Sequence, residues 1–240
     1  MPTAWCVPDP GASWWFDFAT ADAGLGGSVR LTVLPEQAGA RRRAWYWACL
    51  VGDGRPLVAV RDDDVEPPRG ASLEIHASGL WSALHCETVD AHWTVGLEAF
   101  AVSFDDPLDA WGDERGDLVP LGFDLEWEAE ASGPARQPCM VTGEVLVGTE
   151  TVHVDARGWR GLDPGPLAWP GWSRLTGHWD DGPAVASFVV GDDIEARPVH
   201  EAPVRLRDAT GEEVRLSRSL CRLAGPGGRT GAGWWERVAG

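Results

Sequence analysis

The feature that most constrains the fold of this chain is a succession of short apolar runs separated by Gly, Pro and Asp. Runs rich in Val, Leu, Trp and Phe occupy residues 27–35, 44–65, 71–81, 92–106, 121–130, 143–156 and 184–193, and their composition is typical of β-strands. VGDG at 51–54 and VGTE at 147–150 stand where hairpin turns are expected. No segment has the sustained apolar period of an amphipathic helix, and only residues 107–115 are expected to form one helical turn. The sequence therefore predicts an all-β fold, a barrel or a sandwich.

The charge balance excludes whole classes of partner. The chain of 240 residues has 44% hydrophobic residues, enough for one large domain or two small ones. Its formal net charge is -17, and all 20 basic residues are arginine. A basic surface is the electrostatic signature of a nucleic-acid binder, and this chain lacks that composition. We therefore expect neither nucleic acid nor an anionic membrane among its partners.

The cysteines and the N-terminal sequence bear on the compartment. The five cysteines are odd in number and include no CxxC pair, which argues against a disulfide framework and a structural zinc site. MPTAWCVPDP lacks a basic region followed by an apolar run, and the chain has no stretch of about eighteen apolar residues. The aspartates of RDDDV at 61–65 would alternate between the two faces of a strand, which does not suit metal coordination. We expect a cytoplasmic protein without integral membrane association, metal or cofactor.

Fifteen tryptophans against a single tyrosine, Tyr46, are the least ordinary part of the composition. An indole face can hold a cation at roughly 0.5 to 2 kcal/mol per contact, so this excess suggests an aromatic-lined cavity. Packing in the core is the alternative, and it is the commoner role for any single tryptophan. The side chains expected to line a substrate cavity are Trp45, Trp47, Trp81, Trp93, Phe100, Trp127, Trp159 and Trp169.

A faint internal repeat divides the chain into two halves. SWWFDFATA at 13–21 is similar to LGFDLEWEA at 121–129, and the segment 45–65 is similar to the segment 172–194. Gly, Asp and Pro interrupt the strands in GDERGDLVP at 112–120. The expected domains are therefore residues 1–118 and residues 119–240, with chance similarity of β-rich segments as the alternative.

Residues 145–169 carry a resemblance to a known family. A strand, a turn and a second strand lead into GWRGLDPGPLAW, an order similar to the VxGxExxxxxGxGxRDHSWGxRxW pattern of the AttH-like and hydroxyneurosporene synthase (carotenoid hydratase) family. The matching positions are Val147, Gly148, Glu150, Gly158, Arg160, Gly165 and Trp169, whereas Gly161, Leu162, Asp163 and Pro164 stand where the family has Asp-His-Ser-Trp. The resemblance implies two lipocalin-like antiparallel β-barrel or sandwich halves packed together.

The resemblance also implies a chemistry. The family includes hydratases that protonate an isolated isoprenoid double bond, and related proteins act as cyclases or pericyclases. We therefore expect a lyase or isomerase that binds a hydrophobic isoprenoid or polyene and starts hydration, isomerisation or cyclisation with a proton. The acid would be kept protonated by an apolar site, and aromatic faces would stabilise the carbocation. The missing Asp-His-Ser-Trp leaves two alternatives, a lipocalin-like carrier and a pericyclase, which needs no acid.

Candidate acids occur within the apolar strands. Glu98 would share a strand face with Phe100, and Glu87, His92 and Glu98 could form an acid, its orienting partner and a second carboxylate. The further candidates are Glu126, in FDLEWEAE, and Asp155, in VHVDARGW. For each of them a structural ion pair or a solvated strand face is the alternative.

Overall fold

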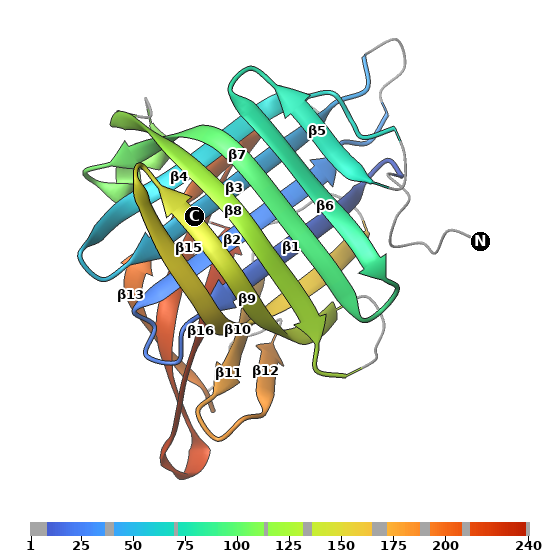
Figure 1. Ribbon diagram of the computed structural model, residues 1–240. Coiled ribbons are helices and arrows are strands. Elements are labelled where there is room, and N and C mark those ends of the chain that lie inside the picture. Colours follow the sequence, from blue (N-terminus) through green and yellow to red (C-terminus); the bar gives the residue numbers. More distant parts are fainter. Residues whose placement is uncertain are drawn as a thin grey trace.

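The computed structural model describes residues 9–36, 41–69, 72–112, 115–131, 136–164, 172–187, 193–207 and 212–238. Throughout these residues the chain forms antiparallel strands, and the predicted all-β class is confirmed (Figure 1). The helical turn expected within 107–115 is the 3-10 helix η2 (Pro107–Trp111), and a second short turn is η3 (Pro226–Gly228). No helix among the described residues has the length and apolar character needed to cross a membrane.

The larger sheet closes on itself. Its strands are β1 (Ala12–Ala19), β2 (Leu25–Val33), β3 (Ala44–Gly52), β4 (Arg55–Val65), β5 (Leu73–Ala77), β6 (Leu80–Thr88), β7 (His92–Phe104), β8 (Asp117–Ala129), β9 (Arg136–Val147) and β10 (Glu150–Pro164). They lie in the order β4-β3-β2-β1-β10-β9-β8-β7-β6-β5, and β4 also pairs with β7 between Leu57 and Phe104. This pairing makes a lipocalin-like barrel of the strands from β4 round to β7, with β6 and β5 continuing beyond the seam.

The smaller sheet packs against one side of the barrel. Its strands are β11 (Ser173–Trp179), β12 (Ala184–Ser187), β13 (Glu195–Glu201), β14 (Val204–Arg207), β15 (Glu213–Gly225) and β16 (Arg229–Val238). The order is β12-β11-β16-β15-β13, and β14 also pairs with β15. A shared apolar cluster joins the two sheets, in which Trp45 and Trp47 of β3 meet Leu220 and Trp234.

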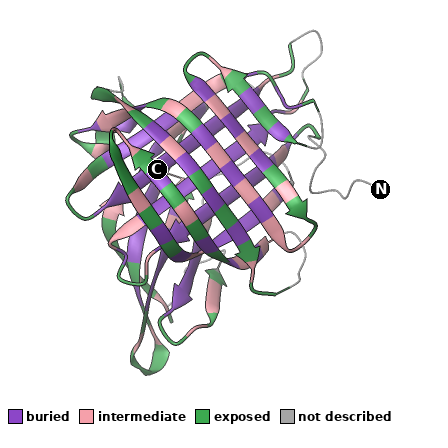
Figure 2. Ribbon diagram, in the orientation of Figure 1, coloured by how far each residue is buried: buried purple, intermediate pink, exposed green. Residues whose placement is uncertain are grey.

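Strand β1 is covered on both faces, which explains why almost all of it is buried (Figure 2). Successive side chains of a strand point to opposite faces. Trp14, Phe16 and Phe18 enter the barrel core, whereas Ser13 and Asp17 point towards the smaller sheet. The front strands of the barrel alternate instead between buried and exposed residues, because the smaller sheet does not cover them.

The interior of the barrel is filled by side chains. Phe16 lies 5.5 Å from the ring of Trp93 and 5.4 Å from that of Trp127 (ring centroids), and both tryptophans are fully buried. The Nε1 of Trp127 donates to the main-chain oxygen of Asp17 at 3.0 Å. These indoles therefore pack the core, which is the alternative that the sequence left open.

The expected boundary between residues 118 and 119 lies inside β8, a continuous strand of the barrel. The chain passes from the larger sheet to the smaller one between β10 and β11 instead. A division into domains at 118 and 119 stays a prediction.

Candidate ligand pocket between the two sheets

Strand β11 presents three polar side chains to the barrel. Arg174, Thr176 and His178 alternate with Leu175, Gly177 and Trp179, so they share one face of the strand. All three are buried. The three side chains have different surroundings. Arg174 belongs to a packed network of charged side chains, Thr176 bonds to a buried carboxylate, and His178 lines an open pocket.

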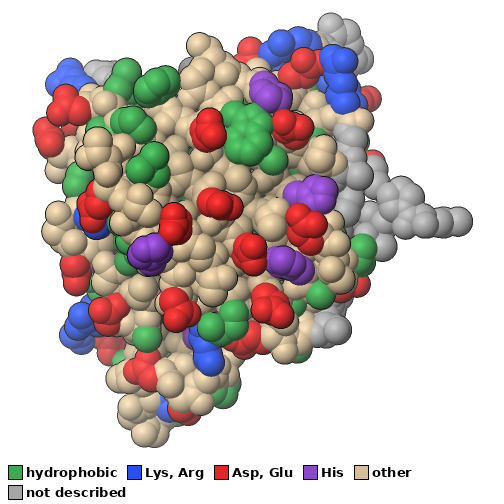
Figure 3. Space-filling view, viewed as in Figure 1, with side chains coloured by type: hydrophobic (Ala, Val, Ile, Leu, Met, Phe, Trp, Pro, Cys, Tyr) green, Lys and Arg blue, Asp and Glu red, His purple; other side chains and the backbone are tan. Residues whose placement is uncertain are grey.

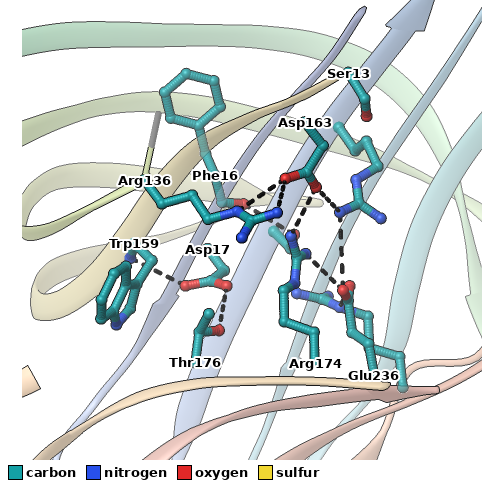
Figure 4. A network of polar contacts seen from close by, with 12 residues as sticks. Ser13, Phe16, Asp17, Arg136, Trp159, Asp163, Arg174, Thr176 and Glu236 are labelled. Carbon is teal, nitrogen blue, oxygen red and sulfur yellow. Dashed lines mark hydrogen bonds and ion pairs between the residues drawn. The ribbon is translucent and has the colours of Figure 1, made fainter. Parts of the chain in front are cut away.

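The ionic end is a network of arginines and carboxylates (Figure 4). Arg174 donates to Asp163 at 3.3 Å and to Glu236 at 2.5 Å. Arg136 donates to Asp163 at 2.7 Å, and Arg218 donates to Glu236 at 2.5 Å. Burial alone would raise the pKa of Glu236, but the charges of the surrounding arginines lower it to about 2. Glu236 is therefore ionised at any physiological pH.

Aromatic rings complete the packing of these arginines. The guanidinium of Arg174 lies 3.7 Å from the ring centroid of Trp15, and that of Arg218 lies 3.8 Å from the ring of Trp234. The indole of Trp15 occupies the space where a side chain at position 161 would begin, since a Cβ on Gly161 would lie 2.2 Å from the ring. Only glycine permits this close approach.

Asp17 lies in the middle of the interface between the barrel and the smaller sheet. Its Oδ1 accepts a hydrogen bond from the backbone N–H of Trp159 at 3.0 Å, and its Oδ2 accepts one from Thr176 at 2.8 Å (Figure 4). Burial raises the pKa of Asp17, against the opposing influence of Arg218 and Arg174. Because both oxygens have partners on neighbouring strands, we assign this carboxylate to joining β1, β10 and β11.

At the far end of β11 the two sheets separate around a pocket of about 320 Å³. Its apolar wall consists of Ala19, Ala21, Met140, Ala156, Trp179 and Ala232. Its polar groups are Asp155 and Arg157 of β10, with His178 and Asp180 on the opposite side. A mainly apolar pocket with a few convergent polar groups is the usual form of a small-molecule site.

His178 is the distinctive group of this pocket. Its side chain is 8% exposed, and its Nε2 has no hydrogen-bond partner among the described residues. Oε1 of Glu130 lies 3.9 Å from that nitrogen, beyond hydrogen-bond distance, and 3.5 Å from Nε of Arg157. Burial and the charge of Arg157 lower the pKa of His178 to about 4. The pocket is therefore lined by a neutral imidazole whose buried Nε2 is unpaired among the described residues.

The structure does not bring the five candidate catalytic residues together. Glu87, Glu98 and Glu126 are exposed on the outer face of β6 to β8. His92 is half-buried beside Glu126, with 3.4 Å between Nε2 and Oε2. These four belong to a face on which acidic and histidine side chains gather (Figure 3). Asp155, also exposed, is the one candidate that lines the pocket between the sheets.

The expected substrate-binding aromatics are also dispersed. Trp93 and Trp127 lie in the barrel core, and Trp45 and Trp47 lie in the apolar cluster between the sheets. The indole of Trp159 is packed beside His178, and its Nε1 donates to the main-chain oxygen of Gly177 at 3.0 Å. Trp81 and Phe100 lie on the outer face of the barrel. Trp169 lies outside the described residues.

Sequence reasoning missed Asp17 and His178. Asp17 lies between two phenylalanines in a strand where every neighbour is apolar, and that isolation was a usable sign of a buried carboxylate. His178 follows Gly177 in a segment that resembled an ordinary hairpin, and nothing in that pattern distinguishes it. Among the described residues, no group of three or more His, Cys, Asp or Glu side chains is placed to hold a metal ion.

The closed barrel and the second sheet packed against it define an all-β, lipocalin-like fold. An AttH-like protein of Nitrosomonas europaea is 11% identical, with 95% of this chain and 92% of that chain covered and a TM-score of 0.51. Kievitone hydratase from Nectria haematococca is 10% identical, with 96% and 89% covered and a TM-score of 0.47. CghA is 9% identical, with 95% and 88% covered and a TM-score of 0.42. At these identities the likeness to the first of them establishes the fold.

A family model described as a domain of unknown function, DUF7064, matches residues 8–193, and the chain belongs to this family. No curated protein matches the chain.

Proposed function

We propose that the protein is an enzyme that binds a small, mainly hydrophobic molecule in the pocket between the two sheets and transfers a proton on it through His178. The observation that carries the proposal is His178, which lines a pocket of about 320 Å³ and whose buried Nε2 has no hydrogen-bond partner among the described residues. A buried polar atom left unpaired costs free energy, and a ligand that supplies the partner recovers it.

The polar groups of the pocket suit a ligand with one hydroxyl or carbonyl group. Arg157 can donate a hydrogen bond to that oxygen, and Asp155 can accept one from a hydroxyl. The neutral imidazole of His178 can act as a base that takes a proton from a bound hydroxyl or water, and the imidazolium formed in that step can return the same proton to another atom of the ligand. These roles fit hydration or isomerisation of an isoprenoid alcohol, and the pocket volume suits a monoterpene better than a long carotenoid.

A non-catalytic carrier is the second candidate function. It is favoured by the sequence of residues 161–164, Gly-Leu-Asp-Pro, where the related family carries Asp-His-Ser-Trp. It is also favoured by the exposure of Asp155, because an exposed carboxylate lies outside the kind of apolar site in which enzymes hold a catalytic acid. The carrier would hold the same class of ligand and release it unchanged.

The test is native mass spectrometry of the protein incubated with geraniol, linalool and myrcene, followed by extraction and analysis of the bound compound. We expect an isomer of the input, or a product that differs from it by one water. In His178→Gln we expect turnover to fall by about a hundredfold or more with binding retained. His153→Gln, which changes an exposed histidine of β10 outside the pocket, is the matched control.

Each other outcome has a definite meaning. Recovery of unchanged ligand at stoichiometric occupancy would replace the enzyme with the carrier. Equal turnover in wild type and His178→Gln would remove His178 from the reaction. If Ala19→Trp, which adds bulk to the pocket from the face of β1 that meets the smaller sheet, leaves ligand binding unchanged, the ligand does not bind between the sheets.

A further inference from the structure

A second hollow lies on the outer face of the barrel, over β5 to β9. It has a volume of about 580 Å³, and its lining includes His76, Trp81, Glu98, Phe100 and Leu146. We call it the outer groove. It shares no lining residue with the pocket between the sheets, and the proposed reaction does not use it.

Large apolar side chains at the outer groove are exposed to solvent. Phe100 is 66% exposed and Leu146 is 40% exposed. The indole of Trp81 lies against the backbone of β7, since a Cβ on Gly96 would be 2.9 Å from its Cη2. Glycine at this position lets the ring lie along the sheet. An indole in this position offers its outer surface to a ligand.

Carboxylates flank this indole on both sides. Glu98 is the cross-strand partner of Trp81 on β7. Oε1 of Glu74 accepts a hydrogen bond from Nε1 of Trp81 at 2.9 Å, and this bond lowers the pKa of Glu74. The hydrogen bond from Trp81 therefore favours the ionised form of Glu74 beside the electron-rich ring.

The basic side chains near this charge are histidines, and Nε2 of His76, which lines the groove, lies 3.1 Å from Oε1 of Glu74. The segments 73–77, 80–88, 92–104 and 117–129, which form β5 to β8, contain no arginine or lysine. Figure 3 shows acidic and histidine side chains spread over this face with hydrophobic side chains among them. An aromatic face between carboxylates on an anionic surface is complementary to an organic cation.

We propose that the outer groove binds a small organic cation with an apolar tail, a protonated or quaternary alkylamine. The ammonium group lies over Trp81 beside Glu98, and the tail follows Phe100 and Leu146. A small molecule is favoured over a protein partner because the groove is a local hollow of ligand size on an otherwise charged face. The site is independent of the reaction proposed for the pocket between the sheets.

Calorimetric titration with hexyltrimethylammonium tests this site, with hexanol and hexyl sulfate as the neutral and anionic comparisons. We expect binding of the cation only. Glu98→Gln should weaken it about fivefold, and Trp81→Leu about tenfold or more, whereas Trp81→Phe should restore most of the affinity. The matched control is Glu126→Gln, which removes the same charge from the same face outside the groove and should change the Kd less than twofold.

Three results would overturn the proposal. Hexanol or hexyl sulfate could bind as tightly as the cation, which would leave a site selected by apolar contact alone. Glu126→Gln could weaken binding as much as Glu98→Gln, which would indicate attraction to the whole face rather than a site. The cation could fail to bind wild-type protein whose circular dichroism is that of the folded state. His178→Gln should bind the cation like wild type, so failure of the proposed reaction leaves this result standing.

Discussion

Among the residues of this protein, His178 most directly links burial to the pH dependence of the free energy of unfolding. Its pKa is about 4, against an ordinary value of 6.5, so the unfolded chain binds the proton more readily than the folded one. The stability that comes from a neutral His178 is fully present above pH 6.5 and is lost as the pH falls towards 4. Across this window we expect the free energy of unfolding to decrease by up to about 3 kcal/mol because of this group.

Urea denaturation of wild type and His178→Gln at pH 7.0 and pH 4.5 measures this contribution. The variant should lose less stability between the two pH values than wild type does, because glutamine does not titrate. His153→Gln, which removes an exposed histidine, should behave like wild type. Equal losses of stability in wild type and His178→Gln would show that the pKa of the imidazole is the same in the folded and the unfolded chain.

At the same scale, Glu98 and Asp17 show what alternation along a strand can and cannot predict. Each is an acid within an apolar run, and the period of two placed Phe100 correctly on the face of Glu98. The pattern could not tell which face a second sheet would cover. Asp17 is 3% exposed because β11 lies over it, whereas Glu98 is exposed to solvent on the uncovered side.

At the scale of elements, the packing of β10 against β11 depends on the absence of a side chain at Gly161. A Cβ on Gly161 would lie 2.2 Å from Trp15, so Gly161→Ala must displace the indole on which Arg174 stacks. We expect Gly161→Ala to lower the free energy of unfolding by about 2 kcal/mol. Chemical denaturation measures the change.

Gly122→Ala is the control for this substitution. It adds the same atom to β8, where the nearest atoms would lie 3.4 Å away, and it should be close to neutral. If both variants were equally stable, Trp15 would have room to move and the close approach would not constrain the interface.

The strands themselves were largely predictable, and their assembly was not. Turn residues and apolar runs indicated the hairpins β3–β4 and β9–β10, both of which form. The closure of β4 on β7 joins residues that are far apart in sequence, and no local pattern encodes such a contact. The positions of the tryptophans could not be predicted for a related reason. Composition cannot distinguish an indole that fills a core from one that lines a cavity.

At the scale of the whole molecule, the two sheets are joined by buried charges as well as apolar contacts. Glu236 is the common partner of Arg174 and Arg218, and its side chain is 2% exposed. Glu236→Gln would leave several buried cations with insufficient negative charge. We expect a loss of about 3 to 5 kcal/mol in the free energy of unfolding.

Thermal and urea unfolding of Glu236→Gln measure this loss. Glu150→Gln is the control, because it breaks an exposed pair with Arg55 and should change stability little. A variant of Glu236 as stable as wild type would mean that Asp163 and Asp17 alone balance the arginines.

The same buried charges have a consequence for how the chain selects one arrangement of its parts. Moving β11 by two residues along the barrel would keep each side chain on its present face, so apolar contacts alone would penalise the error weakly. The move would separate Arg174 from Asp163, which are now 3.3 Å apart, and leave both charges poorly matched in a dry environment. We infer that the ionic network excludes misdocked forms of the C-terminal sheet, so that its main contribution is to the uniqueness of the native state.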